Sequence, residues 1–416
     1  MAPHDALTQN LGVDFNDTEE EAAWRAECRA WVDEHAPEVA AVGTRDDARA
    51  GSARYLERAK TWQALKFDAG LAKITWEPEF GGRNGTTMQQ IIFNQEEARH
   101  PVPADAFVIG LGMIAPTLRS VGTDAQKSRY LTKLLRGEEV WCQMFSEPGA
   151  GSDVASLSMM AARDGDEWRI TGQKVWTSGA QYSDFGEIIC RTDVDAEKHR
   201  GITAFIVDMK APGVTIKPLK QMNGGASFNE VFFDDVRVPH DHVLGDVDQG
   251  WSVAITTLMN ERVAIGSGGG GGMRTSVPDL ISLARRHGRN EDPIVRQRLA
   301  DLYIRSRIQR FLGMRSLTAA SQGRMPGPEG SIGKLSGARL ATALGEMAVA
   351  LVGMGATAQA DHDYDWHDAL LVAPAAHIAG GSDEVMKNII GERVLDLPGE
   401  PRVDKGVAWR EVPRSA

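Results

Sequence analysis

Hydrophobic periodicity changes twice along this chain, and the two changes limit the folds open to it. Over residues 18–136 apolar residues recur at helical intervals, and Thr18 and Glu21 have the spacing of a capping box. Short β-rich runs separated by turn residues occupy residues 140–244, and helical spacing returns from Trp251. This order predicts a β unit docked between two helical units, with a cleft at their junction.

The predicted fold class is therefore α+β with several domains. Helices are expected over residues 87–99, 124–135, 251–266, 293–320 and 333–354. Within the β zone, residues 161–172 read as two strands around an Asp-Gly turn, and the later strands suit a small antiparallel barrel or sandwich. The expected units are an N-terminal α-helical domain (1–138), a middle β domain (139–245), a C-terminal four-helix bundle (246–400) and a tail (401–416).

Composition excludes several classes of function. A net charge of −11 argues against a nucleic-acid partner or an anionic membrane surface, because either would favour a basic face. No stretch approaches the roughly 20 apolar residues of a membrane span, and the first residues lack the pattern of a signal peptide. The three cysteines, Cys28, Cys142 and Cys190, are widely spaced, which indicates a cytoplasmic location and no metal site.

Two short polar segments carry the strongest functional signal. The run CQMFSEPGAGSD covers residues 142–153, and Trp176, Thr177 and Ser178 follow about thirty residues later. Strand-like sequence surrounds both, so a folded sheet could bring them to one face. Glycines let the backbone approach a ligand closely. Hydroxyls, backbone N–H groups and a large aromatic suit a flat ring with a pyrophosphate tail, and a flavin dinucleotide is the leading ligand.

A run of five glycines, residues 268–272, interrupts the third zone. Five glycines cannot form a stable helix interior, because each costs roughly 1 kcal/mol relative to alanine. One interpretation is a flexible loop. The other is a place where missing side chains leave room for a bulky ligand.

Six segments in sequence make the chain resemble an acyl-CoA dehydrogenase over essentially its whole length. FSEPGAGSD (residues 145–153) resembles the first signature of that family, and IAGGSDEVMKNIIGERVLDLP (378–398) resembles the second. Weaker matches lie at residues 79–85, 122–138, 172–179 and 232–239. The resemblance implies an N-terminal helical domain, a middle β domain and a C-terminal four-helix bundle, assembled as a dimer or tetramer around FAD.

The resemblance also implies a set of site residues. Trp176 would pack against the flavin ring, Ser178 would bond toward its N5 atom, and Ser152 would lie near the pyrophosphate. The full cofactor-binding set would be Gln143, Phe145, Ser146, Gly151, Ser152, Trp176, Thr177, Ser178, Ser382 and Glu384. The substrate would contact Ser152, Arg262, Gly380 and Gly381.

The reaction of this family removes a proton beside a thioester while hydride leaves for the flavin, and a carboxylate in a dry pocket is the usual base. Many relatives place that Glu in the second signature, where this chain has Gly380. A smaller branch, resembling isovaleryl- and long-chain-type dehydrogenases, supplies it from a bundle helix directly before an Arg. Glu261, followed by Arg262, matches that pattern and borders the helical stripe that contains Ile255. Glu147 and Glu384 are the other candidates.

The predicted function is the FAD-dependent conversion of an acyl-CoA to the trans-2-enoyl-CoA, as in the β-oxidation of lipids, with an electron-transferring flavoprotein as acceptor. Two segments that hold FAD across the subunit interface in many relatives are altered here, at residues 284–293 and 351–356. One alternative is therefore a partner subunit of a heteromeric enzyme with an incomplete site. Another is a flavin-dependent oxidase or monooxygenase. The glycine run favours a branched, cyclic or bulky acyl group.

Overall fold

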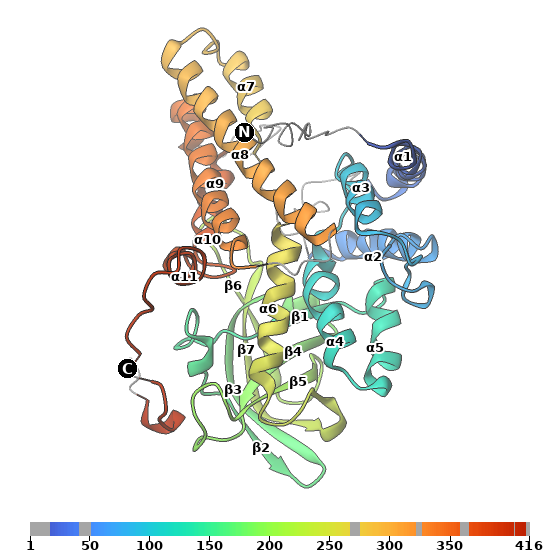
Figure 1. Cartoon of the computed structure of the whole chain (residues 1–416), viewed down its shortest axis with the longest axis vertical. Coiled ribbons are helices and arrows are strands. Elements are labelled where there is room, and N and C mark those ends of the chain that lie inside the picture. The colour runs from blue at the N-terminus through green and yellow to red at the C-terminus, as the bar shows by residue number, and fades with distance from the viewer. Residues whose placement is uncertain are drawn as a thin grey trace, which may run out of the picture.

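The structure is a computed structural model that describes residues 17–40, 51–266, 275–321, 327–357, 366–402 and 404–412. The N-terminal helices lie beside a central sheet, and the C-terminal helices extend away from it (Figure 1). The predicted order of helical, β and helical units is confirmed. The glycine run lies outside the described residues.

The N-terminal helices pack through apolar cores, and polar contacts cap several of them and link the first helix to the third. They are α1 (Glu19–Val39), α2 (Ala53–Asp68), α3 (Thr87–Glu97), α4 (Ala115–Val121) and α5 (Asp124–Arg136), with short turns η1 (Pro78–Phe80), η2 (Asp105–Phe107) and the π-helix η3 (Gly110–Ile114). The capping box predicted at Thr18 is present.

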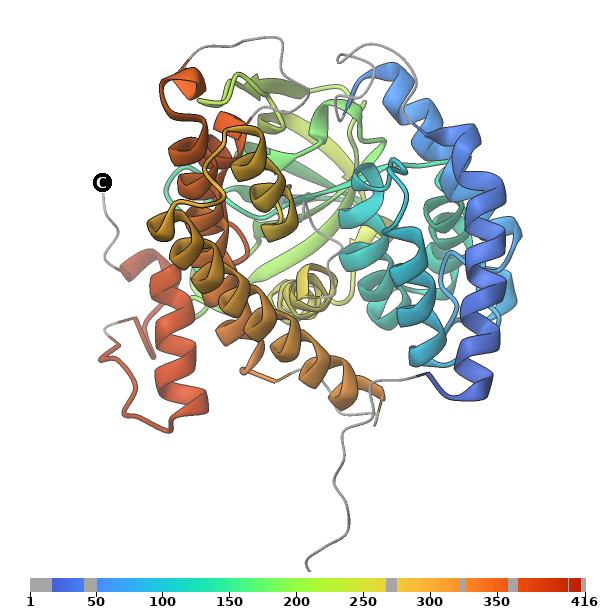
Figure 2. The ribbon, with the colours of Figure 1, turned by 90° about the horizontal axis from the view of Figure 1, so that it is seen from above.

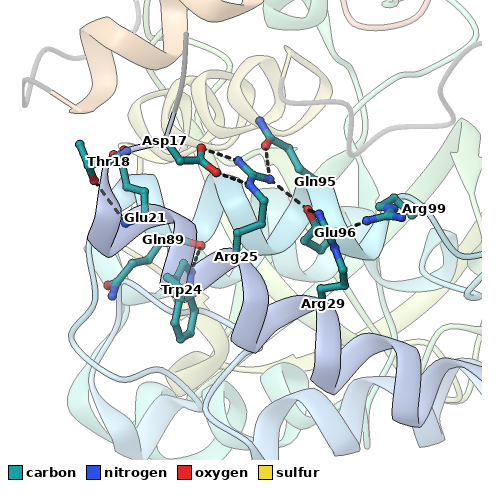
Figure 3. A network of polar contacts seen from close by, with 10 residues as sticks. All are labelled: Asp17, Thr18, Glu21, Trp24, Arg25, Arg29, Gln89, Gln95, Glu96 and Arg99. Atoms are coloured by element: carbon teal, nitrogen blue, oxygen red, sulfur yellow. Dashed lines mark hydrogen bonds and ion pairs between the residues drawn. The ribbon is translucent and has the colours of Figure 1, made fainter. Parts of the chain in front are cut away.

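Arg25, Arg29 and Arg99 surround the buried Glu96 of α3, as Figure 3 shows. Hydrogen bonds from these arginines, Arg29 first, lower the pKa of Glu96 to about 2.

In the described chain, eight strands form one sheet in the order β6-β7-β3-β2-β4-β5-β8, with β1 paired to β4. Their bounds are β1 Trp141–Met144, β2 Met160–Asp164, β3 Glu167–Ser178, β4 Phe185–Arg191, β5 Ile202–Asp208, β6 Val214–Leu219, β7 Phe228–Pro239 and β8 Val243–Leu244. The predicted hairpin is confirmed as β2 and β3. Most neighbouring strands pair antiparallel as expected, whereas β4 pairs in parallel with β1 and, at Met160 and Arg191, with β2.

Successive side chains along each strand point to opposite faces of the sheet, and the two faces pack against different partners. Trp141 of β1, Ile189 of β4 and Ile206 of β5 pack in a core shared with α4, α5 and the helix that follows the sheet. Cys142 and Ile188 point the other way, into a core made by the sheet itself. The face toward the helices is therefore where the three units meet.

The C-terminal unit consists of α6 (Gly250–Gly266), α7 (Val277–Arg286), α8 (Pro293–Ser321), α9 (Gly330–Val352), η7 (Gly353–Thr357), α10 (Trp366–Ala376), α11 (Asp383–Ile389) and η8 (Ile390–Val394). Helices α7, α8, α9 and α10 share one apolar core. The three helices predicted in this zone are confirmed as α6, α8 and α9. Helices α7 and α10 were not predicted, because α7 is short and α10 contains Pro374.

Helix α6 leaves this bundle and runs through the junction of all three units. It contacts η3 and α4 on one side and β4 and β5 on another. Seen from above, it lies between the sheet and the N-terminal helices (Figure 2). Its first residue, Gly250, is so close to β5 that a Cβ there would lie 2.5 Å from the backbone N of Ala204. Only glycine permits this approach without moving the helix.

The segment after residue 400 packs against the middle unit. Trp409, in the short turn η9 (Trp409–Glu411), is buried. The guanidinium carbon of Arg191 lies over its ring, 4.8 Å from the ring centroid. Lys198 makes an ion pair with Asp404 at 2.7 Å. These contacts tie residues 404–412 to the connection between β4 and β5.

The expectation that no stretch approaches a membrane span is wrong for one helix in the described chain: Gly330–Thr357 is long and apolar enough to cross a membrane by length and composition alone. It is α9 together with η7, and it forms the centre of the bundle. About a third (33%) of its most apolar window is buried within this single chain. Most of the other residues of α9 are half-buried.

Candidate active site

The segment that follows β1 docks onto β3 and so joins the two polar segments noted in the sequence. Val175 donates its backbone N–H to the carbonyl oxygen of Ser146 at 2.9 Å. The Lys174 ammonium group donates to the carbonyl oxygen of Phe145 at 3.1 Å. The expectation that a sheet would bring these segments together is confirmed.

A buried ion pair holds the same loop. Lys174 Nζ lies 2.8 Å from Glu147 Oε1, and both side chains are buried. Burial would raise the pKa of the Glu147 carboxyl, but attraction to Lys174 and hydrogen bonds from Ser158 and Met159 bring its net pKa below the usual value. A buried ion pair is tolerated only when its remaining lone pairs are satisfied, and these backbone donors satisfy them. Glu147 is thus occupied structurally.

Trp176 is placed by a β-bulge. Lys174 pairs with Val231 and Thr177 pairs with Asn229, so β3 carries one more residue than β7 across this interval. Trp176 lies in this bulge and has a φ of 61°, a backbone conformation that is rare for a bulky residue. Its side chain is 61% exposed, so it is not a core aromatic of the sheet.

The residues after the bulge offer polar groups. Thr177 Oγ1 is buried and has no hydrogen-bond partner among the described residues. The buried Asn229 donates to the carbonyl oxygen of Thr177 at 2.9 Å and so fixes the backbone there. Ser178 is the last residue of β3 and is partly buried. The exposed indole of Trp176, with its strained backbone, could pack against a planar ring, and the Thr177 hydroxyl could bond to a polar edge of that ring.

Gly149, Gly151 and Ser152 lie at the exposed tip of the loop. A Cβ placed on Gly149 or Gly151 would meet nothing within 4 Å. The open space there is compatible with a bound group lying over the tip. Next to it, Asp153 accepts a hydrogen bond from Lys198 at 2.6 Å, so the tip is attached to the connection between β4 and β5.

The second signature forms a tight turn before α11. Gly380 and Gly381 have φ of 67° and 96°, which other residues rarely adopt. Ser382 caps α11 by accepting from the backbone N–H of Val385. Lys334 of α9 donates to the carbonyl oxygen of Gly381. Glu384 is 77% exposed beside Lys387, which is a poor setting for a base.

Glu261 lies near the end of α6 and is partly buried. The buried side of α6 carries Val253, Ala254 and Thr257, and Glu261 is one turn beyond Thr257 on that side. The apolar stripe expected to begin at Ile255 is not the buried face, because Ile255 is 39% exposed. The reason is that α6 packs on η3, α4 and β5 through the adjacent face. The side chain of Arg262 lies outside what the structure describes.

Sequence reasoning missed one carboxyl close to this region. Glu187 of β4 is fully buried, and the hydroxyl of Thr257 lies 2.8 Å from its Oε1 atom. Burial raises the pKa of Glu187 to about 8, and the hydrogen bond with Thr257 opposes that rise only in part. The signal in the sequence was a single acidic residue within the apolar strand FGEIICR.

Comparison with known proteins gives one family along the chain. The model described as "Acyl-CoA dehydrogenase, N-terminal domain" matches residues 18–138. The model of the middle domain matches residues 142–236, and that of the C-terminal domain matches residues 248–395. Together these matches cover most of the chain.

Individual relatives agree. Acyl-CoA dehydrogenase IpdE1 of Mycobacterium tuberculosis is 37% identical over 388 residues, which cover 91% of this chain and 98% of that protein. A solved structure described as "Tcur3481-Tcur3483 steroid ACAD" matches with a TM-score of 0.80 and 28% identity, over 93% of this chain and all (100%) of the other. The ChsE4-ChsE5 complex from Mycobacterium tuberculosis matches with a TM-score of 0.77 and 27% identity, over 93% and 100% of the two chains.

Replacing Lys174 with Met tests the role of the buried pair. The substitution leaves the Glu147 carboxyl buried without its cation, and we expect a loss of about 3–5 kcal/mol in the free energy of unfolding and much less bound flavin. Because the pKa of Glu147 is lowered in the fold, its stabilisation is present above its ordinary value of 4.5 and is lost as the pH falls. The difference in melting temperature between the two proteins should therefore shrink toward acidic pH.

The matched control is Arg169→Met, which breaks the exposed Arg169–Asp235 pair on the same strand. It should change neither stability nor flavin content appreciably. A Lys174→Met protein with normal flavin content would contradict the assigned role of the pair.

The geometry and the comparisons support the same cofactor. Trp176 is exposed, the Thr177 hydroxyl is unpartnered among the described residues, and the glycine tip is open, so the residues present fit a bound flavin. The three family models follow one another in the order of the three structural units. This chain belongs to the acyl-CoA dehydrogenase family and is an FAD-dependent oxidoreductase that acts on acyl-CoA.

Proposed function

We propose that the protein converts an acyl-CoA to its trans-2-enoyl-CoA, with Glu261 as the base that removes the α-proton. The observation that carries this proposal is the position of Glu261 on α6, one turn beyond the buried Thr257 and partly shielded from water. Gly380, at the position that many relatives use for the base, has no side chain to compete. When bound, FAD supplies the acceptor for the β-hydride.

The residues around the bulge would hold the cofactor. Trp176 would pack against the flavin ring, while Thr177 and Ser178 would offer hydroxyls to its polar edge. Gln143, Phe145 and Ser146 would line the ring from the end of β1 and the start of the loop. Gly151, Ser152, Ser382 and Glu384 would contact the dinucleotide part.

Removal of the α-proton leaves negative charge on the thioester oxygen, which needs hydrogen-bond donors. The backbone N–H of Gly380 would supply one, and the hydroxyl of the cofactor's ribityl chain the other. Lys334 holds the neighbouring Gly381 carbonyl, so the turn that presents this N–H is fixed from α9. Ser152, Gly381 and Arg262 would contact the substrate.

Replacing Glu261 with Gln tests the base. The amide keeps the size of the side chain but cannot accept a proton, so kcat should fall by about 10²–10⁴-fold while bound FAD is retained. Flavin content is read from the absorbance spectrum and kcat from reduction of an artificial electron acceptor. Glu27→Gln, at an exposed carboxylate on α1, is the control and should keep its activity. Undiminished turnover in Glu261→Gln would place the base elsewhere.

The acyl group is proposed to be branched, cyclic or otherwise bulky. Two observations support this: the second signature has Gly380 where many relatives carry the base, which leaves the proposed base on α6, and a steroid ACAD is among the similar structures. Both are compatible with a pocket that opens differently from one built for straight chains.

A panel of thioesters tests that substrate class. Butyryl-CoA and octanoyl-CoA represent straight chains, isobutyryl-CoA a branched one, and cyclohexane-1-carbonyl-CoA a cyclic one. We expect kcat/KM for the cyclic or branched thioesters to exceed that for the straight chains by about tenfold or more, which corresponds to about 1.4 kcal/mol. Preference for the straight chains would refute the proposal. Oxygen consumption measured in parallel would reveal an oxidase or monooxygenase.

The chain is also proposed to work as a homodimer or homotetramer that passes electrons to an electron-transferring flavoprotein. Ile304, Ile308 and Phe311 form an exposed apolar ridge along α8. Beside them lies a pocket of about 360 Å³ between α8, α9 and η8, and most of the apolar window of α9 is not buried in one chain. A second copy of the chain would cover these surfaces.

The second candidate is half of a heteromeric enzyme. It is favoured by the altered segments at residues 284–293 and 351–356 and by similar structures whose descriptions each name two chains. In that case a single purified chain would hold FAD poorly and would gain both flavin and activity only with its partner.

Flavin stoichiometry separates the two candidates. For the homomeric enzyme we expect one FAD per chain in the purified protein and a dimer or tetramer by light scattering. Ile308→Asp, which places a charge on the α8 ridge, should lower the measured mass, whereas Ile255→Asp, at an exposed site on α6, serves as a control for assembly. Half an FAD per chain or less would support the heteromeric candidate.

A further inference from the structure

A buried cluster of hydrogen bonds joins all three units at the turn of α6 that precedes Glu261. Glu187 comes from β4 of the middle unit, Thr117 from α4 of the N-terminal unit, and Thr257 and Asn260 from α6. Thr257 Oγ1 lies 2.8 Å from Glu187 Oε1 and 3.0 Å from Thr117 Oγ1. Asn260 Nδ2 donates to Thr117 Oγ1 at 3.1 Å. Side chains on the last turns of α6 before Glu261 are thereby attached to both other units.

Counting protons defines the state of this cluster. The hydroxyl of Thr117 donates to the carbonyl oxygen of Met113 at 2.8 Å, so it must accept from its other neighbours. The hydroxyl of Thr257 has one proton, which it can donate to Thr117, to Glu187 or, at 3.2 Å, to the carbonyl oxygen of Val253 in its own helix. If Glu187 is protonated, it donates to Thr257, Thr257 donates to Thr117, and Thr117 donates to Met113. Each hydroxyl then donates one hydrogen bond; Thr257 accepts one, and Thr117 accepts two, from Thr257 and Asn260.

If Glu187 is ionised, the proton of Thr257 turns toward it and the bond to Thr117 is lost. A buried carboxylate also requires other donors, and Glu187 Oε2 has no hydrogen-bond partner among the described residues. Its neighbours in the sheet are Gln143 on β1 and Ile206 on β5, neither of which carries a charge. The neutral acid is therefore the form that the surroundings favour.

Burial is also the main cause of the raised pKa of Glu187, which lies at about 8. Thr257 of α6 contacts its carboxyl group and Thr117 of α4 contacts Thr257. The nearest titratable side chain along α6 is Glu261. No cation in the described chain contributes to the pKa of Glu187. The carboxyl group is therefore mostly protonated at neutral pH.

We propose that Glu187 is a positioning residue whose protonated carboxyl group, through Thr257 and Thr117, sets the rotation of α6 and thereby the direction in which Glu261 faces the substrate. This inference rests on the proposed role of Glu261 as base. It assigns no contact between Glu187 and the substrate. Glu187 acts only through Thr257, and the cluster fixes α6 against the sheet and α4 at the turn before the base.

The test isolates the proton step. The analogue of cyclohexane-1-carbonyl-CoA with sulfur in place of both β-carbons, 1,3-dithiane-2-carbonyl-CoA, can lose its α-proton but has no β-hydrogen to give as hydride. Exchange of its α-hydrogen for deuterium in D₂O, followed by mass spectrometry, therefore reports on Glu261 alone. We expect Glu187→Leu to slow this exchange by tenfold or more with little change in the KM of the substrate. Glu187→Gln, whose amide can donate to Thr257, should restore the exchange.

A packing control separates positioning from general destabilisation. Val253→Ala removes buried apolar volume from α6 one turn before Thr257 and leaves the cluster intact. It should lower the melting temperature as Glu187→Leu does, yet exchange should stay within about twofold of the original protein. Equal losses of exchange in the two variants, or normal exchange in Glu187→Leu, would overturn the inference.

The pH dependence gives a second readout. The pKa of Glu187 is raised in the fold from 4.5 to about 8, so stability is lost as the pH rises through this interval. Glu187→Gln cannot ionise, and its melting temperature relative to the original protein should rise between about pH 5 and pH 8 and then level off. The original protein should also lose exchange activity above about pH 8, and Glu187→Gln should not. A constant difference in melting temperature across this interval would show that Glu187 is not neutral in the fold.

If Glu261→Gln abolishes exchange while Glu187→Leu leaves it unchanged, the positioning role alone is wrong. If Glu261→Gln exchanges normally, the assignment of the base is wrong and the positioning role is wrong with it. The two failures are therefore distinguishable.

Discussion

The close packing of α6 against the sheet is the constraint on which the rest of the molecule depends. Helix α6 starts at Gly250, where an added Cβ would lie 2.5 Å from the backbone N of Ala204 in β5. The helix therefore cannot shift toward the sheet. Near its other end a Cβ on Gly112 would lie 2.8 Å from the Cβ of Ala264, so η3 is equally close. A helix held at both ends presents the residues of its last turns in a defined direction. Glu261 is one of them.

The energetic costs of the fold are concentrated around the proposed site. The Lys174–Glu147 pair is buried, Trp176 has a left-handed backbone conformation, and Glu187 is a carboxyl group inside an apolar core. Each of these features lowers stability unless its surroundings compensate, and such features commonly gather where a protein binds or reacts. The compensation is visible for the pair, which has backbone donors, and for Thr257, which shares its hydrogen bonds with α4.

Much of this architecture could be predicted from the sequence, for reasons that are local. Helices with a clear period and a capping box, such as α1 and α5, depend mainly on contacts within a few residues. The hairpin of β2 and β3 follows from its two-residue Gly165-Asp166 turn, one residue later than the expected Asp-Gly pair. By contrast, the parallel pairing of β1 with β4 joins segments distant in the sequence, which no local pattern encodes. The family resemblance supplied the domain order and the cofactor.

The candidate site divides in the same way. Glu261, Trp176 and the two signatures stand out in the sequence because their residue types are unusual at those places. The surroundings of these residues cannot be read from the sequence, since burial of a side chain depends on segments far away along the chain. Ile255, for example, has the spacing of a core residue yet is exposed, because α6 packs through its neighbouring face.

The amino-acid sequence by itself determined the three units, the family, the cofactor and the residues to consider. Tertiary structure alone decided that Lys174 neutralises Glu147, that a bulge turns Trp176 outward, and that Glu187 meets Thr257 and Thr117. The physical reason is that the charge state and orientation of a side chain are set by the groups packed around it. Those groups come from β1, β4, α4 and α6, which only folding brings together.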